Sequence, residues 1–442
     1  MVNLLTRLSA ALLPFLVVFA ACRAPDPIEG GVVGAPVSSR GSSGINRADQ
    51  RDKPYVILVS FDGFKPEYLD RFRLPGFRRM IERGVRAKAM IPVFPSLTFP
   101  NHYSLVTGLY PEHHGLVENT FHDPERNRTY SIRDRAAVSD GTWYRGEPIW
   151  ATAETQGMVA ACFFWPGSEA AIDGVRPTIW NKYDDRIPNE TRVQAALEWL
   201  RMPPERRPHV ITLYFSELDV VSHRGPLDAP AIAEATQSLD RALEALVKGL
   251  DSLPIRDRIY LLLTSDHGMA ETSGRHTVML NSLIDTATVI VGYDGPIAGL
   301  HVTGDTSGAR EIRDRINSRL QHGRAYLRAE VPEQHHFRED PRIGDIVIIM
   351  EEPWMLLASP PVLNLLRERW GNHGWDPALP SMHAIFIIAG PDIPAGVSIP
   401  FVDNIDVYPL MTELLGLRAA QPIDGRPGRI RELMGGGQQR LR

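Results

Sequence analysis

Carboxylates and imidazoles stand where three apolar segments of the sequence end. They are Asp62 after residues 55–61, Asp219 after residues 209–215, and Asp266 with His267 after residues 258–264. His223 follows Asp219 by four positions, a spacing that puts both side chains on one face of a helical turn and that many metal sites use. Taken alone, that pair also fits a solvent-facing ion pair. With His373, which lies between glycines in GNHGW, the donor set suits two zinc ions.

A nucleophile for this site is offered by the stretch 92–104, PVFPSLTFPNHYS, which centres on the hydroxyl of Thr98. Its three prolines fix φ and remove backbone donors, so it is neither an ordinary helix nor a central strand. We expect a rigid loop and then a helix that starts near residues 100–101, whose N-terminus would attract a phosphate anion. Taken alone, the stretch also fits a stiff turn with Thr98 as a helix cap. The carboxylates and imidazoles elsewhere favour the catalytic interpretation.

These side chains need elements that bring them together, and apolar runs alternate with amphipathic segments along the chain. The expected strands are 55–61, 159–165, 209–215, 258–264 and 383–389, and the expected helices are 74–83, 191–201, 230–250 and 405–417. This alternation predicts a layered α/β fold with a mostly parallel central sheet. The carboxyl ends of parallel strands form the ligand crevice, so the strand-end carboxylates should meet there. Between 281 and 344 the pattern breaks up, and we expect a small insert or cap.

Composition excludes one class of function. The chain has 442 residues and a formal net charge of −5, so it has no broad basic surface for binding a nucleic-acid duplex. Only two cysteines occur, Cys22 and Cys162, and with Cys22 in a targeting segment no internal disulfide is expected. Nothing in the sequence indicates the oligomeric state.

The N-terminal region predicts export. An apolar run at residues 8–21 follows Arg7 and is too short for a comfortable membrane span, so we predict a signal peptide over 1–21. Residues 22–53 are rich in Pro, Gly and Ser and predict a flexible tether. FAAC resembles a bacterial lipobox, which implies a lipid anchor on Cys22 and a periplasmic or outer-membrane location. Ordinary cleavage after one of the two preceding alanines stays open as the alternative.

Five long motifs occur in a fixed order between about residues 54 and 417. They are VILVSFDGFKPEYL, PVFPSLTFPNHYSLVTGLYPEHHGLVEN, LYFSELDVVSHRGP, TSDHGM and GNHGW. Together they resemble the nucleotide pyrophosphatase/phosphodiesterase family of the alkaline phosphatase superfamily. The resemblance implies an alkaline-phosphatase-like α/β/α phosphodiesterase domain over residues 54–425, followed by a C-terminal tail at 426–442.

The resemblance also implies roles for individual residues, with Thr98 as the nucleophile. It implies a first zinc held by Asp62, Thr98, Asp266 and His267, and a second held by Asp219, His223 and His373. Asn119 would bind a phosphate oxygen together with the Thr98 amide, and Phe99 and Tyr183 would stack a nucleobase. His383 is the competing choice for the ligand assigned to His373. His102, His113 and His114 fall at expected loop positions and are assigned to surface or supporting roles.

The function implied is zinc-dependent hydrolysis of nucleotide phosphodiester and pyrophosphate bonds through a covalent intermediate on Thr98, releasing nucleoside 5′-monophosphates. A neutral Asn119 favours a singly charged diester, because a doubly charged monoester gains more from an arginine. Three alternatives stay open: a phosphomonoesterase of the same superfamily, a phosphodiesterase of choline-phosphate lipids, and a non-catalytic zinc-binding surface lipoprotein. Structural zinc sites need neither an open position nor a hydroxyl nucleophile, which argues against the last of these.

Overall fold

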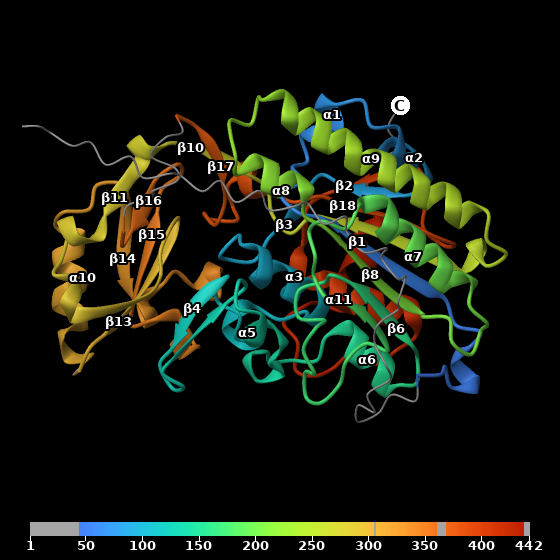
Figure 1. Cartoon of the computed structure of the whole chain (residues 1–442), viewed down its shortest axis with the longest axis horizontal. Helices are drawn as coiled ribbons and strands as arrows, with labels where there is room; N and C mark the ends of the chain where they lie inside the picture. Colours follow the sequence, from blue (N-terminus) through green and yellow to red (C-terminus); the bar gives the residue numbers. More distant parts are fainter. Residues whose placement is uncertain (1–43, 305, 360–367, 437–442) are drawn as a thin grey trace, which may run out of the picture.

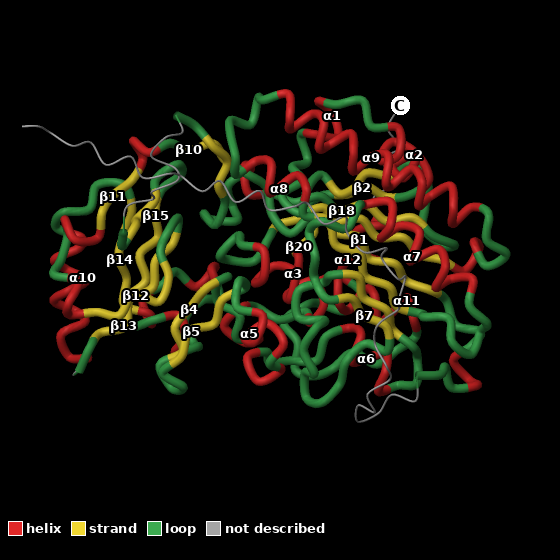
Figure 2. The backbone as a smooth tube through the Cα atoms, in the orientation of Figure 1, coloured by secondary structure: helices red, strands yellow, loops and turns green. Residues whose placement is uncertain are grey.

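The centre of the molecule is an eight-stranded sheet between two layers of helices (Figures 1 and 2). The computed structural model describes residues 44–304, 306–359 and 368–436. The strand order is β19-β2-β18-β9-β1-β8-β6-β7. In chain order the strands are β1 (Tyr55–Phe61), β2 (Val85–Ala87), β6 (Ala160–Phe163), β7 (Ile179–Asn181), β8 (Val210–Phe215), β9 (Ile259–Thr264), β18 (Phe386–Ala389) and β19 (Val397–Ile399).

The sheet is mostly parallel, as predicted. The five strands β9, β1, β8, β6 and β7 run parallel to one another, whereas β18 is antiparallel to both β9 and β2. Every residue of β1, β8 and β9 is buried. Strands covered on both faces need continuous apolar sequence, which is why these three were recognisable from the sequence.

Helices cover both faces of the sheet. On one face lie α2 (Pro75–Arg83), α7 (Asn189–Arg201) and α9 (Pro230–Asp251), and both α2 and α7 pack on α9. On the other lie α3 (Thr98–Thr107), α6 (Ile149–Thr155) and α11 (Val407–Leu415). The architecture is therefore the predicted α/β/α arrangement. The remaining helices are α1 (Tyr68–Arg71), α4 (Pro111–His114), α5 (Arg135–Ser139), α8 (Glu217–Ser222), α10 (Ala309–Asn317) and α12 (Arg429–Gly436).

A second, smaller sheet occupies the region where the sequence pattern breaks up, at the left of Figure 1. It is antiparallel, in the order β12-β13-β15-β14. Its strands are β12 (Val289–Tyr293), β13 (Ile297–Val302), β14 (Gly323–Leu327) and β15 (Ile346–Met350). Together with α10 it encloses a hydrophobic core of its own, with members from Leu280 to Leu356. We call residues 280–357 the insert; the boundaries 281–344 stay a prediction.

Four two-stranded ribbons complete the fold. They are β4 (Thr120–Asp123) with β5 (Arg128–Ser131), β10 (Ala270–Thr272) with β17 (Trp370–Asn372), β11 (Thr277–Met279) with β16 (Met355–Leu357), and β3 (Met90–Ile91) with β20 (Val402–Asp403). Strand β4 lies beside β12 and so joins the main body to the insert (Figure 1).

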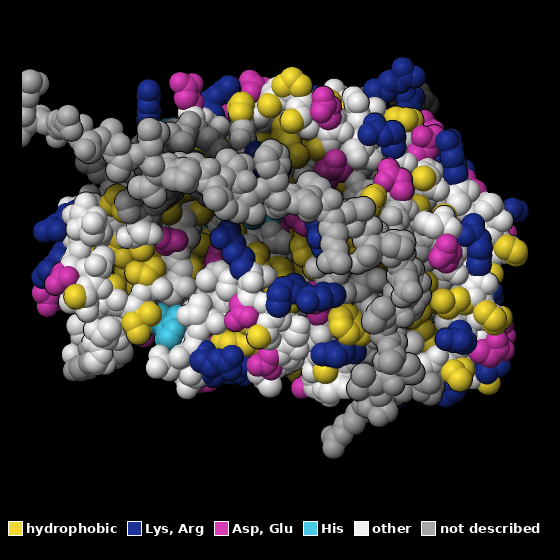
Figure 3. Space-filling view, viewed as in Figure 1, with side chains coloured by type: hydrophobic (Ala, Val, Ile, Leu, Met, Phe, Trp, Pro, Cys, Tyr) yellow, Lys and Arg dark blue, Asp and Glu magenta, His cyan; other side chains and the backbone are white. Residues whose placement is uncertain are grey.

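The predicted signal peptide and residues 22–43 of the predicted tether, with Cys22, lie outside the described residues. Residues 44–53 of that tether are described, and here Asn46 is buried and donates from Nδ2 to the carbonyls of Pro204 and Arg207. No helix in the described ranges is long and apolar enough to span a membrane. On the face seen in Figure 3, basic and acidic side chains are interspersed, in keeping with the low net charge.

Candidate active site

The carboxyl ends of three adjacent parallel strands bring the acidic residues together. Strands β9, β1 and β8 are neighbours, and Asp62 follows β1 directly, while Asp266 comes two residues after β9. Asp219 lies in α8, the short helix that follows β8. Asp62 and Asp266 are at most 1% exposed, so these charges are withdrawn from water. The predicted meeting of the three carboxylates at this edge is what the structure shows.

Four of the predicted residues form a first group around the Nε2 atom of His267. This atom lies 3.0 Å from Asp266 Oδ2, 3.3 Å from Thr98 Oγ1 and 3.5 Å from Asp62 Oδ1. Three elements contribute to the group: the end of β1, the start of α3 and the segment after β9.

Three more predicted residues form a second group. Asp219 Oδ1 lies 3.3 Å from His223 Nε2 and 3.5 Å from His373 Nε2, and the two imidazole nitrogens are 3.2 Å apart. The groups adjoin, because the rings of His267 and His373 stack with centroids 3.6 Å apart. In addition, donor atoms of Asp62, Asp219 and His267 all lie within 4.8 Å of one another. His383 is not in either group, and its ring contacts Phe401 instead.

Each of the three histidines directs the same nitrogen into the cluster. Nδ1 lies 2.8–2.9 Å from a backbone carbonyl in every case: Gly268 for His267, Gly371 for His223 and Ser96 for His373. Donation from Nδ1–H to a carbonyl fixes the ring orientation and leaves the Nε2 lone pair for a cation. The backbone thus prepares all three rings for metal ligation.

The donor set fits zinc. One buried oxygen each of Asp62, Asp219 and Asp266 (Oδ1, Oδ1 and Oδ2) has no hydrogen-bond partner among the described residues. A buried acceptor left without a partner costs about 1–3 kcal/mol, and more when it is charged, unless a cation lies there. Zinc bonds of about 2.0–2.1 Å in a tetrahedron place neighbouring ligand atoms about 3.3 Å apart. The observed separations of 3.0–3.5 Å match that spacing.

The electrostatics of the cluster favour a cation. Burial, together with the charges of Asp266 and Asp219, raises the pKa of Asp62 well above its usual value. Burial opposes ionisation of Asp219 too, but His223 and His373 lower its pKa to about 2. Burial and the neighbouring His267 lower the pKa of His373 to about 3, so this ring is neutral and can act as a ligand.

The nucleophile candidate lies at the first turn of a helix. Helix α3 begins at Thr98, two residues before the predicted start. Pro100 does not prevent this, because the first backbone N–H groups of a helix have no partner within the helix in any case. The Phe99 N–H donates to Asn119 Oδ1 at 2.9 Å, so Asn119 is held beside Thr98 and has its Nδ2 amino group to offer. The Thr98 amide, as the first of the helix, has no acceptor within the helix.

The two aromatic residues predicted to hold a base lie near the cluster on different segments. Phe99 follows Thr98 and is half-buried. Tyr183 Oη lies 3.1 Å from Ser216 Oγ, and its ring centroid is 6.1 Å from that of Tyr214. Among the described ring contacts none joins Phe99 to Tyr183, so the two rings do not pack on each other.

Of two further residues at the cluster, Tyr214 was not identified from the sequence, and His102 was given a surface or supporting role at a loop position. Tyr214 donates from its hydroxyl to Asp62 Oδ2 at 2.5 Å. His102, assigned to a loop, lies in α3 and is fully buried; its Nδ1 is 2.9 Å from the Thr98 carbonyl and 3.3 Å from Asp266 Oδ2. The signal for His102 was its position four residues after Thr98, which puts both on one helix face once α3 begins at Thr98.

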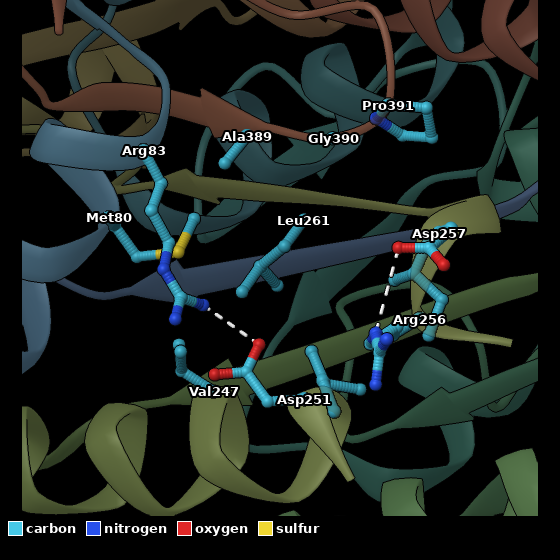
Figure 4. A pocket seen from close by; sticks show the side chains of 12 residues that line it. Met80, Arg83, Val247, Asp251, Arg256, Asp257, Leu261, Ala389, Gly390 and Pro391 are labelled. Atoms are coloured by element: carbon cyan, nitrogen blue, oxygen red, sulfur yellow. Dashed lines mark hydrogen bonds and ion pairs between the residues drawn. The ribbon is translucent and has the colours of Figure 1, made fainter. Parts of the chain in front are cut away.

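A separate cavity of about 370 Å³ lies between α2, α9 and the start of β9 (Figure 4). Its charged side chains pair with one another, Arg83 with Asp251 at 2.8 Å and Arg256 with Asp257 at 3.6 Å. None of the described residues that line it is a histidine. Because it adjoins the end of β9 opposite to Asp266, it is not part of the candidate active site.

Comparisons with known proteins agree with this geometry. A family described as "Type I phosphodiesterase / nucleotide pyrophosphatase" matches residues 56–376. Ectonucleotide pyrophosphatase/phosphodiesterase family member 1 of Mus musculus is 37% identical over 394 residues, covering 87% of this chain and 43% of that protein. A venom phosphodiesterase of Crotalus durissus collilineatus is 36% identical over 389 residues, covering 86% of this chain and 46% of that protein. The chain therefore spans less than half the length of these relatives.

A solved structure extends the likeness to three dimensions. Murine ectonucleotide pyrophosphatase/phosphodiesterase 5, an inactive variant in complex with AMP, superposes with a TM-score of 0.80 at 29% identity. The match covers 86% of this chain and 100% of that one.

Proposed function

This chain belongs to the type I phosphodiesterase / nucleotide pyrophosphatase family, and we propose that it hydrolyses nucleotide phosphodiester and pyrophosphate bonds and releases nucleoside 5′-monophosphates. The observation that carries the proposal is the position of the Thr98 hydroxyl, 3.3 Å from His267 Nε2 in a cluster of three carboxylates and three imidazoles. A hydroxyl at a helix N-terminus beside such a donor set is suited to phosphoryl transfer.

In the proposed reaction the Thr98 hydroxyl gives up its proton, its oxygen attacks phosphorus, and the bond to the leaving oxygen breaks, so that the proton ends on the leaving group or in solvent. The nucleotidyl group is then esterified to Thr98, and water hydrolyses this ester and regenerates the hydroxyl. Asn119 Nδ2 and the Thr98 amide would donate to a non-bridging phosphate oxygen, since Asn119 Oδ1 already accepts from Phe99. The first turn of α3 adds the positive end of a helix dipole.

Two zinc ions are the proposed cofactors. Asp62, Thr98, Asp266 and His267 would hold one, and Asp219, His223 and His373 the other. When bound, they would supply Lewis-acid stabilisation of negative charge on the attacking and leaving oxygens. Two divalent cations would also neutralise three carboxylates together with one deprotonated threonine, which fits the charge of this cluster.

A nucleotide diester is the proposed substrate class. Asn119 is a neutral donor. A doubly charged monoester would gain more from an arginine at this position, so the neutral amide fits a singly charged diester better. Phe99 and Tyr183 would hold the base. The structure of the murine relative holds AMP, which supports a nucleotide as substrate here.

Export is proposed on the apolar run at residues 8–21. The similarity to an ectonucleotide enzyme and to a venom enzyme supports a location outside the cytoplasm. A lipid on Cys22 would be the means of membrane anchoring.

The test is a substrate panel on the protein after its metal content has been determined by elemental analysis. We expect two zinc ions per chain and turnover of ATP and thymidine 5′-monophosphate p-nitrophenyl ester well above that of p-nitrophenyl phosphate and glycerophosphocholine. Preference for p-nitrophenyl phosphate would identify a phosphomonoesterase instead, and preference for glycerophosphocholine a lipid phosphodiesterase. A metal-loaded protein that turns over none of the four would contradict the proposal.

A further inference from the structure

Arg342 is an arginine of the insert whose guanidinium is buried in the main body. It lies in the 3₁₀ turn Pro341–Ile343 before β15, and only 3% of it is exposed. Burial of a guanidinium is costly unless its donors are satisfied and its charge is paired. The contacts of the Arg342 guanidinium therefore compensate for the cost of burying its charge.

All the recorded partners of the guanidinium belong to the main body. Nε donates to Asp123 Oδ2 at 2.9 Å, and Asp123 is equally buried. Nη1 donates to the carbonyl of Gly115 at 2.9 Å and to that of Trp143 at 2.8 Å. The planar guanidinium of an arginine has five N–H donors and can reach these divergent acceptors at once. The ammonium group of a lysine has three donors on a single nitrogen and cannot.

Two of these partners are the ends of one segment, residues 115–123, and Asn119 lies at its middle. A single guanidinium therefore ties the Gly115 end to the Asp123 end. Gly115 has a φ of +84°, and a Cβ atom there would lie 2.7 Å from Arg342 Nη1. The segment is thus shaped to admit this side chain. Asn119 in turn accepts from the Phe99 N–H in the first turn of α3.

Neighbouring contacts fix Arg342 itself. The residues before it, 335–340, lie against the segments on both sides of α3. The ring of His336 stacks on that of Tyr110 at 3.9 Å, and the ring of His335 lies 4.3 Å from that of Phe94. Glu112 accepts from two backbone N–H groups of this stretch, those of Arg338 and Glu339.

We propose that Arg342 is a positioning residue for phosphate binding: it closes residues 115–123 into a fixed loop and thereby holds Asn119 against the first turn of α3. This inference rests on the proposed function, because it assumes that Asn119 binds a phosphate oxygen. It gives the insert a part in catalysis that does not require Arg342 to touch the substrate. Strand β4, which includes Asp123, lies beside the insert in Figure 1, where this connection is made.

A double-mutant cycle tests the proposal, with thymidine 5′-monophosphate p-nitrophenyl ester as substrate and kcat, KM, zinc content and thermal midpoint measured for each variant. N119A alone should lower kcat by about 100- to 1,000-fold, the usual effect of losing one such donor. R342K should lower kcat by about 10- to 100-fold with KM and zinc content nearly unchanged, because a small displacement of a catalytic donor costs about that much.

The decisive measurement is R342K in the N119A background. If Arg342 acts through Asn119, the added loss should be less than about twofold, since interacting residues are not additive. The matched control is R313K, because Arg313 pairs with Glu330 and Asp314 inside the insert, and it should leave kcat unchanged. The same loss from R342K in both backgrounds would overturn the inference.

D123N is a second probe, which keeps the shape of the side chain that pairs with Arg342. It should lower kcat in the wild-type background and add little further loss in the N119A background. If both R342K and D123N fail to fold, Arg342 is a folding residue and the inference is wrong. Failure of the proposed function has a different signature: the zinc-loaded wild type would then not turn over this substrate at all. A wild type that turns over the substrate while N119A keeps the same kcat would overturn the inference alone.

Discussion

At the scale of single residues, three features distinguish the hydroxyl of Thr98. It is 3.3 Å from His267 Nε2, it lies at the first position of α3, and it is only 8% exposed. A solvent-facing helix cap would show none of these, because the N-cap residue precedes the first helical position and is Leu97 here. The position therefore favours a nucleophile over a cap, and this leads to a direct prediction.

Thr98→Ala should keep both zinc ions and lose several orders of magnitude in kcat, because water lacks the alignment of the tethered oxygen. Thr98→Ser should retain part of the activity, since the oxygen stays but the methyl group that restricts χ1 is lost. Mass spectrometry after rapid acid quench should find a nucleotidyl adduct on the Thr98 peptide of the active protein. An Ala variant with near wild-type turnover and no adduct in the wild type would rule out covalent catalysis here.

Tyr183 is the residue that should separate nucleotide from simple diester substrates. Tyr183→Ala should raise KM for nucleotides by the equivalent of about 1–3 kcal/mol, the range for stacking a base on an aromatic side chain. Hydrolysis of bis-p-nitrophenyl phosphate, which has no nucleobase, serves as the control and should change much less. Equal losses on both substrates would mean that Tyr183 supports the fold through Ser216 and Tyr214.

Single residues also show what the sequence could and could not predict of the site. Asp62 and Asp266 were identifiable because each ends an apolar run that can only be a buried strand. Tyr214 was not, because an aromatic residue inside such a run looks like core. Its role depends on the hydroxyl reaching Asp62 Oδ2 on the neighbouring strand, a contact that no spacing within one strand reveals.

At the scale of elements, prediction succeeded where burial is uniform. Strand β1 was predicted with its observed bounds, because both faces are covered and the apolar run is unbroken. Strands β12 and β14 of the insert were not predicted, since they mix buried positions with partly or fully exposed ones over five residues each. The start of α3 was misplaced because Pro100 was taken as its boundary, although proline is tolerated in a first turn.

The short helix α4 carries a testable pH dependence. The carboxylate of Asp424 accepts from His113 Nδ1 at 2.7 Å and raises the pKa of His113 to about 9 from 6.5, although burial opposes the shift. Because the pKa of His113 is raised on folding, its ion pair with Asp424 stabilises the fold fully below pH 6.5. This stabilisation is lost as the pH rises to about 9. His113→Gln should therefore lower the thermal midpoint by about 1–2 °C near pH 6 and have no effect near pH 10. An equal effect at both pH values would contradict this assignment.

At the scale of the whole molecule, the site is a junction between distant parts of the chain. Its candidate metal ligands run from Asp62 to His373. They come from the segments after β1 and β9, from α8 and its C-terminal end, from α3 and from the segment after β17. Three buried carboxylates repel one another unless a cation lies among them. Zinc should therefore stabilise the tertiary fold as well as the transition state, because it binds the folded chain and not the unfolded one.

Removal of metal by a chelator should abolish activity and lower the thermal midpoint by several degrees, and added zinc should restore both. His373→Ala should reproduce the loss of one zinc and of activity, because its Nε2 lies 3.5 Å from Asp219 Oδ1 and 3.2 Å from His223 Nε2. His383→Ala is the matched control: this histidine contacts Phe401 and not the cluster, so both ions should stay bound. If His383→Ala lost a zinc while His373→Ala kept both, the second group would be assigned to the wrong histidine. Full activity with an unchanged midpoint in a protein shown by elemental analysis to hold no transition metal would instead refute the zinc site as a whole.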